Sequence, residues 1–169
     1  VLRLINTQDA TVAGAVAAAL PALAHAVDLG VAALRGGGRV HYAGAGSSGR
    51  LGVLDAAEIP PTYGYPPDRF TAHLAGGAAA MTAAVEDVED SVSSGRGDLA
   101  GVTASDLVVG LAASGRTPYV AGAFEAARAV GAPTVLITAN PAATLAPDVL
   151  VCAATGPEAI AGSTRMKAG

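Results

Sequence analysis

Five short apolar runs, separated by stretches with helical periodicity, constrain the fold of this chain more than any other feature. The runs cover 39–45, 70–75, 107–113, 133–138 and 148–153. Such runs indicate buried strands, and helices between them imply parallel strands with right-handed crossovers. The sequence therefore predicts an α/β fold, a three-layer αβα sandwich with a five-stranded parallel sheet.

The helices of this sandwich are predicted from the same pattern. We expect them at 77–92 and 117–130, in the stretch that Arg50 opens after the first strand, and in a shorter segment that starts near Pro157. The gap at 139–147 is too short for a normal helix, so we expect a loop there.

Residues 8–35 precede the first strand and repeat apolar side chains every three or four positions. This spacing predicts a helix. Asn6 or Thr7 can cap its start, and Pro21 should kink it or divide it into two helices. We therefore expect residues 1–38 to form an N-terminal helical segment that packs on a core domain, residues 39–169.

The composition limits the classes of partner. The 169 residues suit one domain, and a net charge of -4 argues against nucleic acid or an anionic membrane as a partner. A single cysteine, Cys152, excludes an internal disulfide, and no His/Cys spacing resembles a metal site. We expect no metal and no cofactor, and a reducing cytoplasm is permitted as the location.

Neither a leader nor a membrane-spanning run is expected. We find no basic-then-apolar leader and no apolar run long enough to cross a bilayer. The chain begins without Met and stops at Gly169, within what reads as a motif. We therefore expect both ends to be truncated.

A glycine-rich stretch, AGAGSSGRLGVLDAAEIPPTYG at 43–64, follows the first predicted strand. Its glycines allow a sharp turn that leaves amide N–H groups free at a helix start, which is an anion site. Ser47 and Ser48 add hydroxyl donors, and Arg50 adds a positive charge. These groups predict phosphate as the ligand.

The same glycines spell G-x-G-x-x-G, so dinucleotide binding is an alternative. A dinucleotide fold needs an acidic residue that closes the second strand and holds the ribose. Asp68 has roughly that spacing but precedes the apolar run at 70–75. The two serines also suit a terminal monophosphate better than a pyrophosphate, and we favour a monophosphate.

Two further loops share this composition, AASGRTP at 112–118 and AGSTRMKAG at 161–169. Ser and Gly also occur in ordinary turns, but three such loops after strands of one parallel sheet favour anion binding, since ligands lie beyond the carboxyl ends of the strands. The candidate phosphate-binding residues are Ser47, Ser48, Gly49, Ser114, Gly115, Arg116 and Thr117. The other candidate substrate-binding residues are Gly46, Arg50, Ser163, Thr164 and Lys167.

These motifs resemble a known family. The loops SSGR and SGRT are similar to the sugar isomerase (SIS) domain, in which Ser/Thr loops bind the phosphate of a phosphosugar. The strings GAGSSGRLGVLDAAEIPPTYG, AVEDVED, AASGRTPYV and GPEAIAGSTRMKAG more narrowly resemble the N-acetylmuramic acid 6-phosphate etherases, over nearly the whole chain. Members of that family continue beyond the last motif with further helices.

The resemblance implies a flavodoxin-like SIS fold and a phosphorylated amino sugar as substrate. It implies a lyase that removes D-lactate by elimination and hydration during cytoplasmic amino sugar recycling, with no metal. It also implies a homodimer with active sites at the subunit interface. The apolar first helix agrees with a homodimer.

Two glutamates are the candidate catalytic residues. Glu58 lies two turns after Arg50, and Pro60-Pro61 should end its helix directly behind it. A surface glutamate near a helix end is the alternative interpretation. As the acid that assists lactate departure and then activates the water, Glu58 would need a pKa raised by partial burial near apolar neighbours such as Leu54.

The second candidate, Glu89, belongs to the acidic run 86–90. Like charges three and four positions apart repel, which favours a solvated face for Glu86 and Asp87. The family motif marks Glu89, and its implied role is proton transfer at C2 or to the water. Two other functions are open: a phosphosugar aldose-ketose isomerase and a sugar-phosphate sensor without catalysis.

Overall fold

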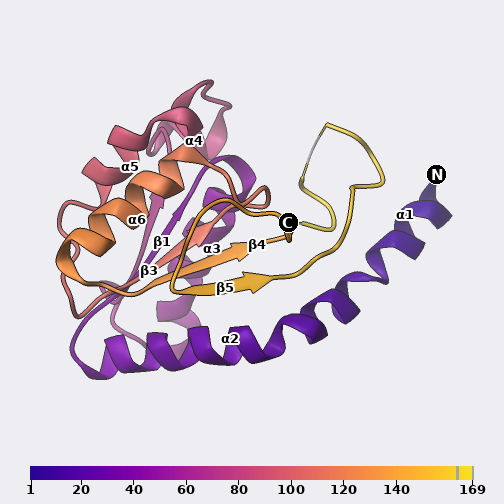
Figure 1. Ribbon diagram of the computed structural model, residues 1–169. Coiled ribbons are helices and arrows are strands. Elements are labelled where there is room, and N and C mark those ends of the chain that lie inside the picture. The colour runs from indigo at the N-terminus through magenta and orange to yellow at the C-terminus, as the bar shows by residue number, and fades with distance from the viewer. Residues whose placement is uncertain (163, 169) are drawn as a thin grey trace.

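A computed structural model describes residues 1–162 and 164–168. Five parallel strands form one sheet in the order β2-β1-β3-β4-β5 (Figure 1). Their bounds are β1 Val40–Gly44, β2 Phe70–Leu74, β3 Leu107–Leu111, β4 Thr134–Thr138 and β5 Val149–Cys152. Every strand falls inside one of the predicted runs, and the strand order is that of flavodoxin-like folds. The predicted five-stranded parallel sheet is confirmed.

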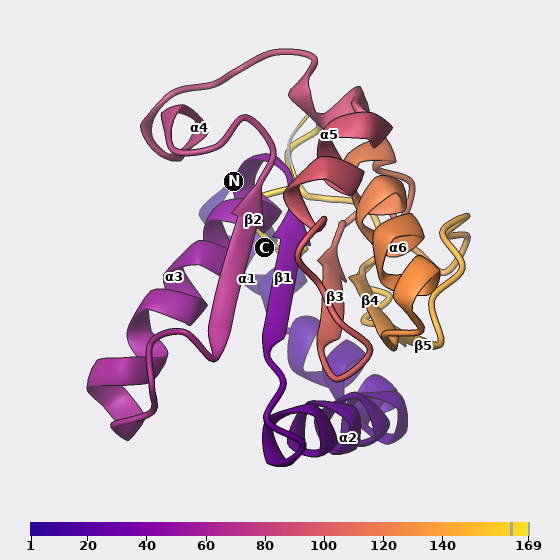
Figure 2. The same ribbon diagram turned by 90° about the vertical axis from the view of Figure 1, so that its left-hand side faces the viewer.

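Helices cover both faces of the sheet and complete the predicted three-layer sandwich (Figure 2). The helices α2, Val12–Arg35, and α3, Gly46–Tyr63, lie on one face. The helices α5, Val92–Asp98, and α6, Pro118–Val130, lie on the other. Because every strand enters from the same end, the loops that follow β1, β3 and β5 meet at one edge.

The hydrophobic core is divided by the sheet, since neighbouring residues of a strand point to opposite faces. Val108 packs with Phe124 of α6 on one face, and Val109 packs with residues of α2 on the other. The helices α5 and α6 touch backbone to backbone, because a Cβ on Gly122 would lie 2.0 Å from the carbonyl oxygen of Val92. This contact fixes the segment that leads into α5.

The N-terminal helices differ from the prediction in where they divide. Helix α1 spans Leu2–Asp9, and α2 runs without interruption through Pro21. The chain breaks at Ala10 and Thr11 instead. There both the amide and the hydroxyl of Thr11 donate to the carbonyl of Gln8, which closes the last turn of α1.

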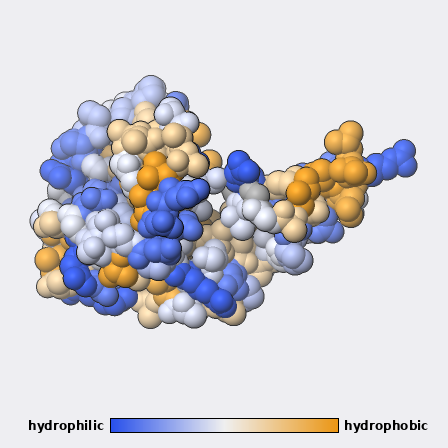
Figure 3. Space-filling model, turned by 90° about the horizontal axis from the view of Figure 1, so that it is seen from above, coloured by the Kyte–Doolittle hydropathy of each residue, from blue (hydrophilic) through white to orange (hydrophobic). Residues whose placement is uncertain are grey.

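Helix α1 projects from the body of the molecule at its right-hand end (Figure 1). Leu2 and Leu4 are 82% and 57% exposed. Figure 3 shows this arm from above, with hydrophobic residues near its end. Within the described residues, no other part of the chain buries these apolar side chains.

Together, α1 and α2 contradict the expectation that no segment is long and apolar enough to cross a bilayer. An 18-residue window within Leu2–Arg35, with a mean hydropathy of 1.7, meets that test of length and composition. However, α2 packs one side against the sheet, where Ala19 and Ala33 are buried. Its uncovered side carries an apolar stripe, called here the α2 stripe, made of Val16, Leu20, Val27 and Val31, each at least 39% exposed.

The prediction of a helix at 77–92 is wrong. The segment holds only α4, Ala79–Thr82, and a 3-10 turn η1, Val88–Asp90, before α5 begins. Gly77 and Asp87 both adopt positive φ, which interrupts a continuous helix. Ser91 then caps α5 by accepting a hydrogen bond from the amide of Ser94 at 3.1 Å.

Two further boundaries differ from the prediction. Helix α3 continues through Pro60-Pro61 to Tyr63 and ends at Gly64, whose φ is +64°. The two prolines remove two helical hydrogen bonds but keep helical φ values, so the helix continues. The prediction of a short helix near Pro157 is wrong. The described residues from 153 to 168 form turns, bends and irregular chain. The loop predicted at 139–147 is confirmed.

Candidate phosphate-binding site

A cavity of about 490 Å³ lies beyond the carboxyl ends of β1 and β3. Three loops line it, those after β1 and β3 and the C-terminal segment that follows β5. Within residues 1–162 and 164–168, the hydroxyl groups that line it come from Ser47, Ser48, Ser114, Thr117 and Thr164. The structure therefore brings together polar residues from all three motifs.

Two long helices begin at this cavity. The first turn of α3, Gly46 to Ser48, lines it, and so do Thr117 and Pro118 at the start of α6. The first amides of a helix have no partner inside the helix, and its N-terminal end carries a partial positive charge. Two such ends directed at one cavity favour a phosphate there.

Glycines allow α3 to start directly against β1. A Cβ on Gly49 would lie 2.5 Å from the carbonyl oxygen of Gly44, so only glycine permits this approach. Gly49 is buried and does not itself line the cavity. Its contribution is the position of the Gly46–Ser48 turn.

The loop after β3 is held by the end of β4. Asn140 donates through Nδ2 to the carbonyl of Ser114 at 2.7 Å, and the Thr138 hydroxyl donates to the carbonyl of Ala113 at 3.0 Å. Gly115 turns the chain with a φ of +65°. The Ser114 hydroxyl accepts from the amide of Arg116 at 3.3 Å and lines the cavity.

Four charged side chains line the same cavity. Glu89 and Asp90 come from η1, while Arg116 and Arg165 come from the second and third loops. The cavity thus offers carboxylates for proton transfer beside cations for an anion. Sequence reasoning missed Asp90; the signal that could have found it is its position directly after Glu89 in the same short turn.

Several predicted site residues do not line the cavity. Arg50 donates to the backbone carbonyls of Ala80 and Ala83, at 2.8 and 2.9 Å, and so fastens the segment around α4 to α3. Gly115 serves the turn described above. Lys167 is buried and donates to backbone and side-chain oxygens elsewhere. Ser163 lies outside the described residues.

Glu58 is also remote from the cavity of its own chain. It lies ten residues beyond Ser48 on α3, which corresponds to about 15 Å along a helix. Both Glu58 and Leu54 are exposed. The predicted partial burial of Glu58 beside Leu54 is therefore wrong for the chain by itself.

A pair of histidines lies on the neighbouring strands β1 and β2, outside the cavity. The Nδ1 atom of His41 is 3.1 Å from Nε2 of His73 and 2.8 Å from the Thr71 hydroxyl. Burial lowers the pKa of both histidines, although the charge of Asp106 opposes this for His41. In the described chain, no group of three or more His, Cys, Asp or Glu could hold a metal ion.

The fold and the cavity define a class of protein. Residues 22–128 match the family model described as the glucokinase regulatory protein N-terminal SIS domain. The chain therefore belongs to the SIS-domain family. It also superposes on a phosphoheptose isomerase from Francisella tularensis with a TM-score of 0.66 and 17% identity, over 98% of this chain and 90% of that one. At this identity the likeness shows the fold alone.

Two curated relatives with high sequence identity share one name. The chain is 63% identical, over its whole length, to N-acetylmuramic acid 6-phosphate etherase of Thermobifida fusca. It is 54% identical, over 99% of its length, to the protein of the same name from Symbiobacterium thermophilum. It spans 56% and 57% of the lengths of these two relatives.

Proposed function

We propose that this chain carries the phosphosugar site of an N-acetylmuramic acid 6-phosphate etherase, which converts its substrate to N-acetylglucosamine 6-phosphate and D-lactate. The observation that carries the proposal is the convergence of two helix N-termini and, among the described residues, five hydroxyl side chains on one cavity, with Glu89 on its wall. The identity to curated relatives of that name supports it.

The 6-phosphate binds between the starts of α3 and α6. Ser47 and Ser48 donate from one side, and Ser114 and Thr117 donate from the other. Each hydrogen bond to the dianion contributes on the order of 1.5 to 3 kcal/mol. Arg116 adds a positive charge, which stabilises the bound phosphate.

The reaction is an elimination followed by hydration. Opening of the sugar ring gives an aldehyde at C1, which acidifies the hydrogen on C2. Glu89 accepts that proton, the C3–O bond breaks, and the departing lactate oxygen takes a proton from a second acid. Water then adds across the C2–C3 double bond, with its hydroxyl on C3 and a proton on C2. Two carboxyl groups are sufficient for these proton transfers.

Glu58 is the second acid, and it comes from the partner subunit of a homodimer. Within one chain it lies about 15 Å along α3 from Ser48, farther than a hexose phosphate extends. The α2 stripe and the exposed arm formed by α1 supply apolar surface that a second copy would cover. Contact with that copy would also bury Glu58.

Release of D-lactate tests the function. The chain is incubated with N-acetylmuramic acid 6-phosphate in deuterated buffer, and D-lactate and deuterium at C2 are both measured. We expect lactate from the parent chain. A Glu58→Gln variant should exchange the C2 hydrogen without releasing lactate, because proton removal at C2 does not need the leaving-group acid. A parent chain that binds phosphosugars but releases no lactate would refute the etherase proposal.

A further inference from the structure

One carboxylate organises the end of the chain. Glu158 accepts hydrogen bonds from three consecutive backbone amides, those of Met166 at 3.3 Å, Lys167 at 3.0 Å and Ala168 at 3.2 Å. Burial alone would raise the pKa of Glu158, but these amides and the Lys167 charge outweigh it and lower the pKa. Consecutive amides that converge in this way bind an anion, and here the chain supplies the anion itself.

The segment needs this anchor because it has no regular structure. Its described residues from 153 to 168 form neither helix nor strand, so their amides lack a ladder of backbone partners. Lys167 is only 5% exposed, and its Nζ donates to the carbonyl of Thr155 at 2.8 Å and to Oε1 of Gln8 at 2.9 Å. The bonds of Glu158 and the bond to Thr155 therefore hold the segment together, and the bond to Gln8 fixes it to α1.

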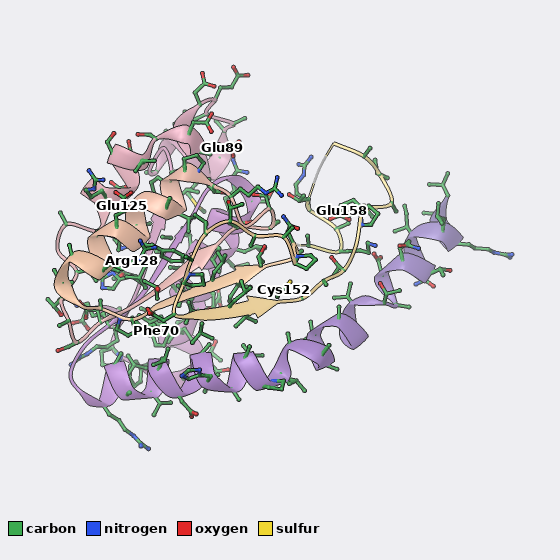
Figure 4. The ribbon with its side chains drawn as sticks, viewed as in Figure 1. Phe70, Glu89, Glu125, Arg128, Cys152 and Glu158 are labelled. Atoms are coloured by element: carbon green, nitrogen blue, oxygen red, sulfur yellow. The ribbon has the colours of Figure 1, made fainter. Side chains whose placement is uncertain are left out.

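The anchored segment forms one wall of the phosphate-binding cavity. Thr164 and Arg165 line that cavity directly before the three bonded amides. A neighbouring cavity is lined by Glu158, Ser114 and Thr164, so Thr164 and Ser114 border both. Figure 4 labels Glu158 on the C-terminal segment and Glu89 on the segment before α5, two different sides of the site.

We propose that Glu158 is a positioning residue, whose bonds to the amides of residues 166–168 hold Thr164 against the phosphate-binding cavity. Glu158 does not touch the substrate and acts through Thr164. The inference rests on the proposed phosphosugar site but not on the etherase chemistry. Binding of a phosphosugar can therefore test it even if no lactate is released.

The first test follows the amides themselves, without ligand. Hydrogen exchange of residues 166–168 is compared in the parent chain, in Glu158→Gln and in Glu125→Gln. Glu125 is a suitable control, since its carboxylate is exposed and pairs with Arg96 on α5. We expect faster exchange at these amides only in Glu158→Gln. Unchanged exchange would overturn the proposal.

The second test is a double-mutant cycle on the binding of N-acetylglucosamine 6-phosphate by calorimetry. Glu158→Gln should weaken binding roughly tenfold, while Glu125→Gln should not. In a Thr164→Ala background, Glu158→Gln should have little further effect, because the residue that it positions is already lost. Fully additive losses would show a general structural role and overturn the proposal.

Folding of the variants is checked by their melting temperatures. If Glu158→Gln does not fold, Glu158→Asp replaces it, since this change keeps the charge but shortens the side chain by one methylene. We expect the same faster exchange and weaker binding. Parent-like exchange and affinity in Glu158→Asp would overturn the proposal, because the shorter carboxylate cannot reach all three amides.

Discussion

Mixing two inactive variants offers the sharpest test of a shared active site. Glu58→Gln removes the proposed leaving-group acid, and Glu89→Gln removes the proposed base at C2. Because Glu58 lies about 15 Å along α3 from the cavity that Glu89 lines, we expect each site to combine one residue from each subunit. A dimer of one variant of each kind then contains one intact site and one doubly altered site.

The magnitude of the recovery follows from this geometry. Random pairing of equal amounts makes half of the dimers mixed, and each mixed dimer has one intact site of two, so roughly a quarter of the parent activity should return. The two chains are co-expressed with different tags, and lactate release is measured on the mixture. Each variant alone is the control.

The opposite result has an unambiguous meaning. If Glu58 acted within its own chain, neither subunit of a mixed dimer would contain an intact site. Mixed dimers that are recovered through both tags and still release no lactate would therefore refute the shared site. A single 16.3 kDa species in sedimentation at micromolar concentration would refute the dimer itself.

Three further predictions concern binding and stability. Ser114→Ala should weaken the binding of N-acetylglucosamine 6-phosphate by roughly 10-fold to 100-fold, and parent-like affinity in calorimetry would remove Ser114 from the phosphate site. The folded pKa values of His41 and His73 are lowered by burial, so the unfolded chain binds more protons below about pH 6.5. Urea unfolding should show stability falling from pH 7.5 to 5.5, and a flat profile would contradict this. Gly122→Ala should destabilise the chain by about 1 to 3 kcal/mol through its clash with α5, whereas Gly97→Ala, with nothing within 4 Å, should not.

The sequence alone determined the sheet. The strands lie inside the predicted runs because buried parallel strands must be apolar on both faces, and this requirement is visible in any short segment. The Gly/Ser/Thr loops were found in the same way, since Ser47 and Ser114 each follow a strand. Their meeting at one edge follows from parallel strand direction, so that part of the site was also predictable.

Predictions from local sequence pattern were wrong where tertiary contacts or backbone conformation decide the structure. The segment 77–92 has helical spacing, but positive φ at Gly77 and Asp87 interrupts a helix there, and Glu89 lies on the wall of the cavity. The arginines of the Gly/Ser/Thr-rich loops also have different positions, which composition cannot reveal. Both Arg116 and Arg50 donate to backbone carbonyls, but only Arg116 also lines the cavity.

The contacts of Glu158 depended on the tertiary structure alone, whereas the distance of Glu58 from the cavity follows from helix geometry. Glu58 was chosen for its nearness to the glycine-rich turn in sequence, yet the rise of a helix carries it away from the cavity. Glu158 carried no signal at all, because its partners are amides eight to ten residues further on. Sequence pattern records which faces must be buried, but the direction of an individual polar side chain is set by partners that only the folded chain brings within hydrogen-bonding distance.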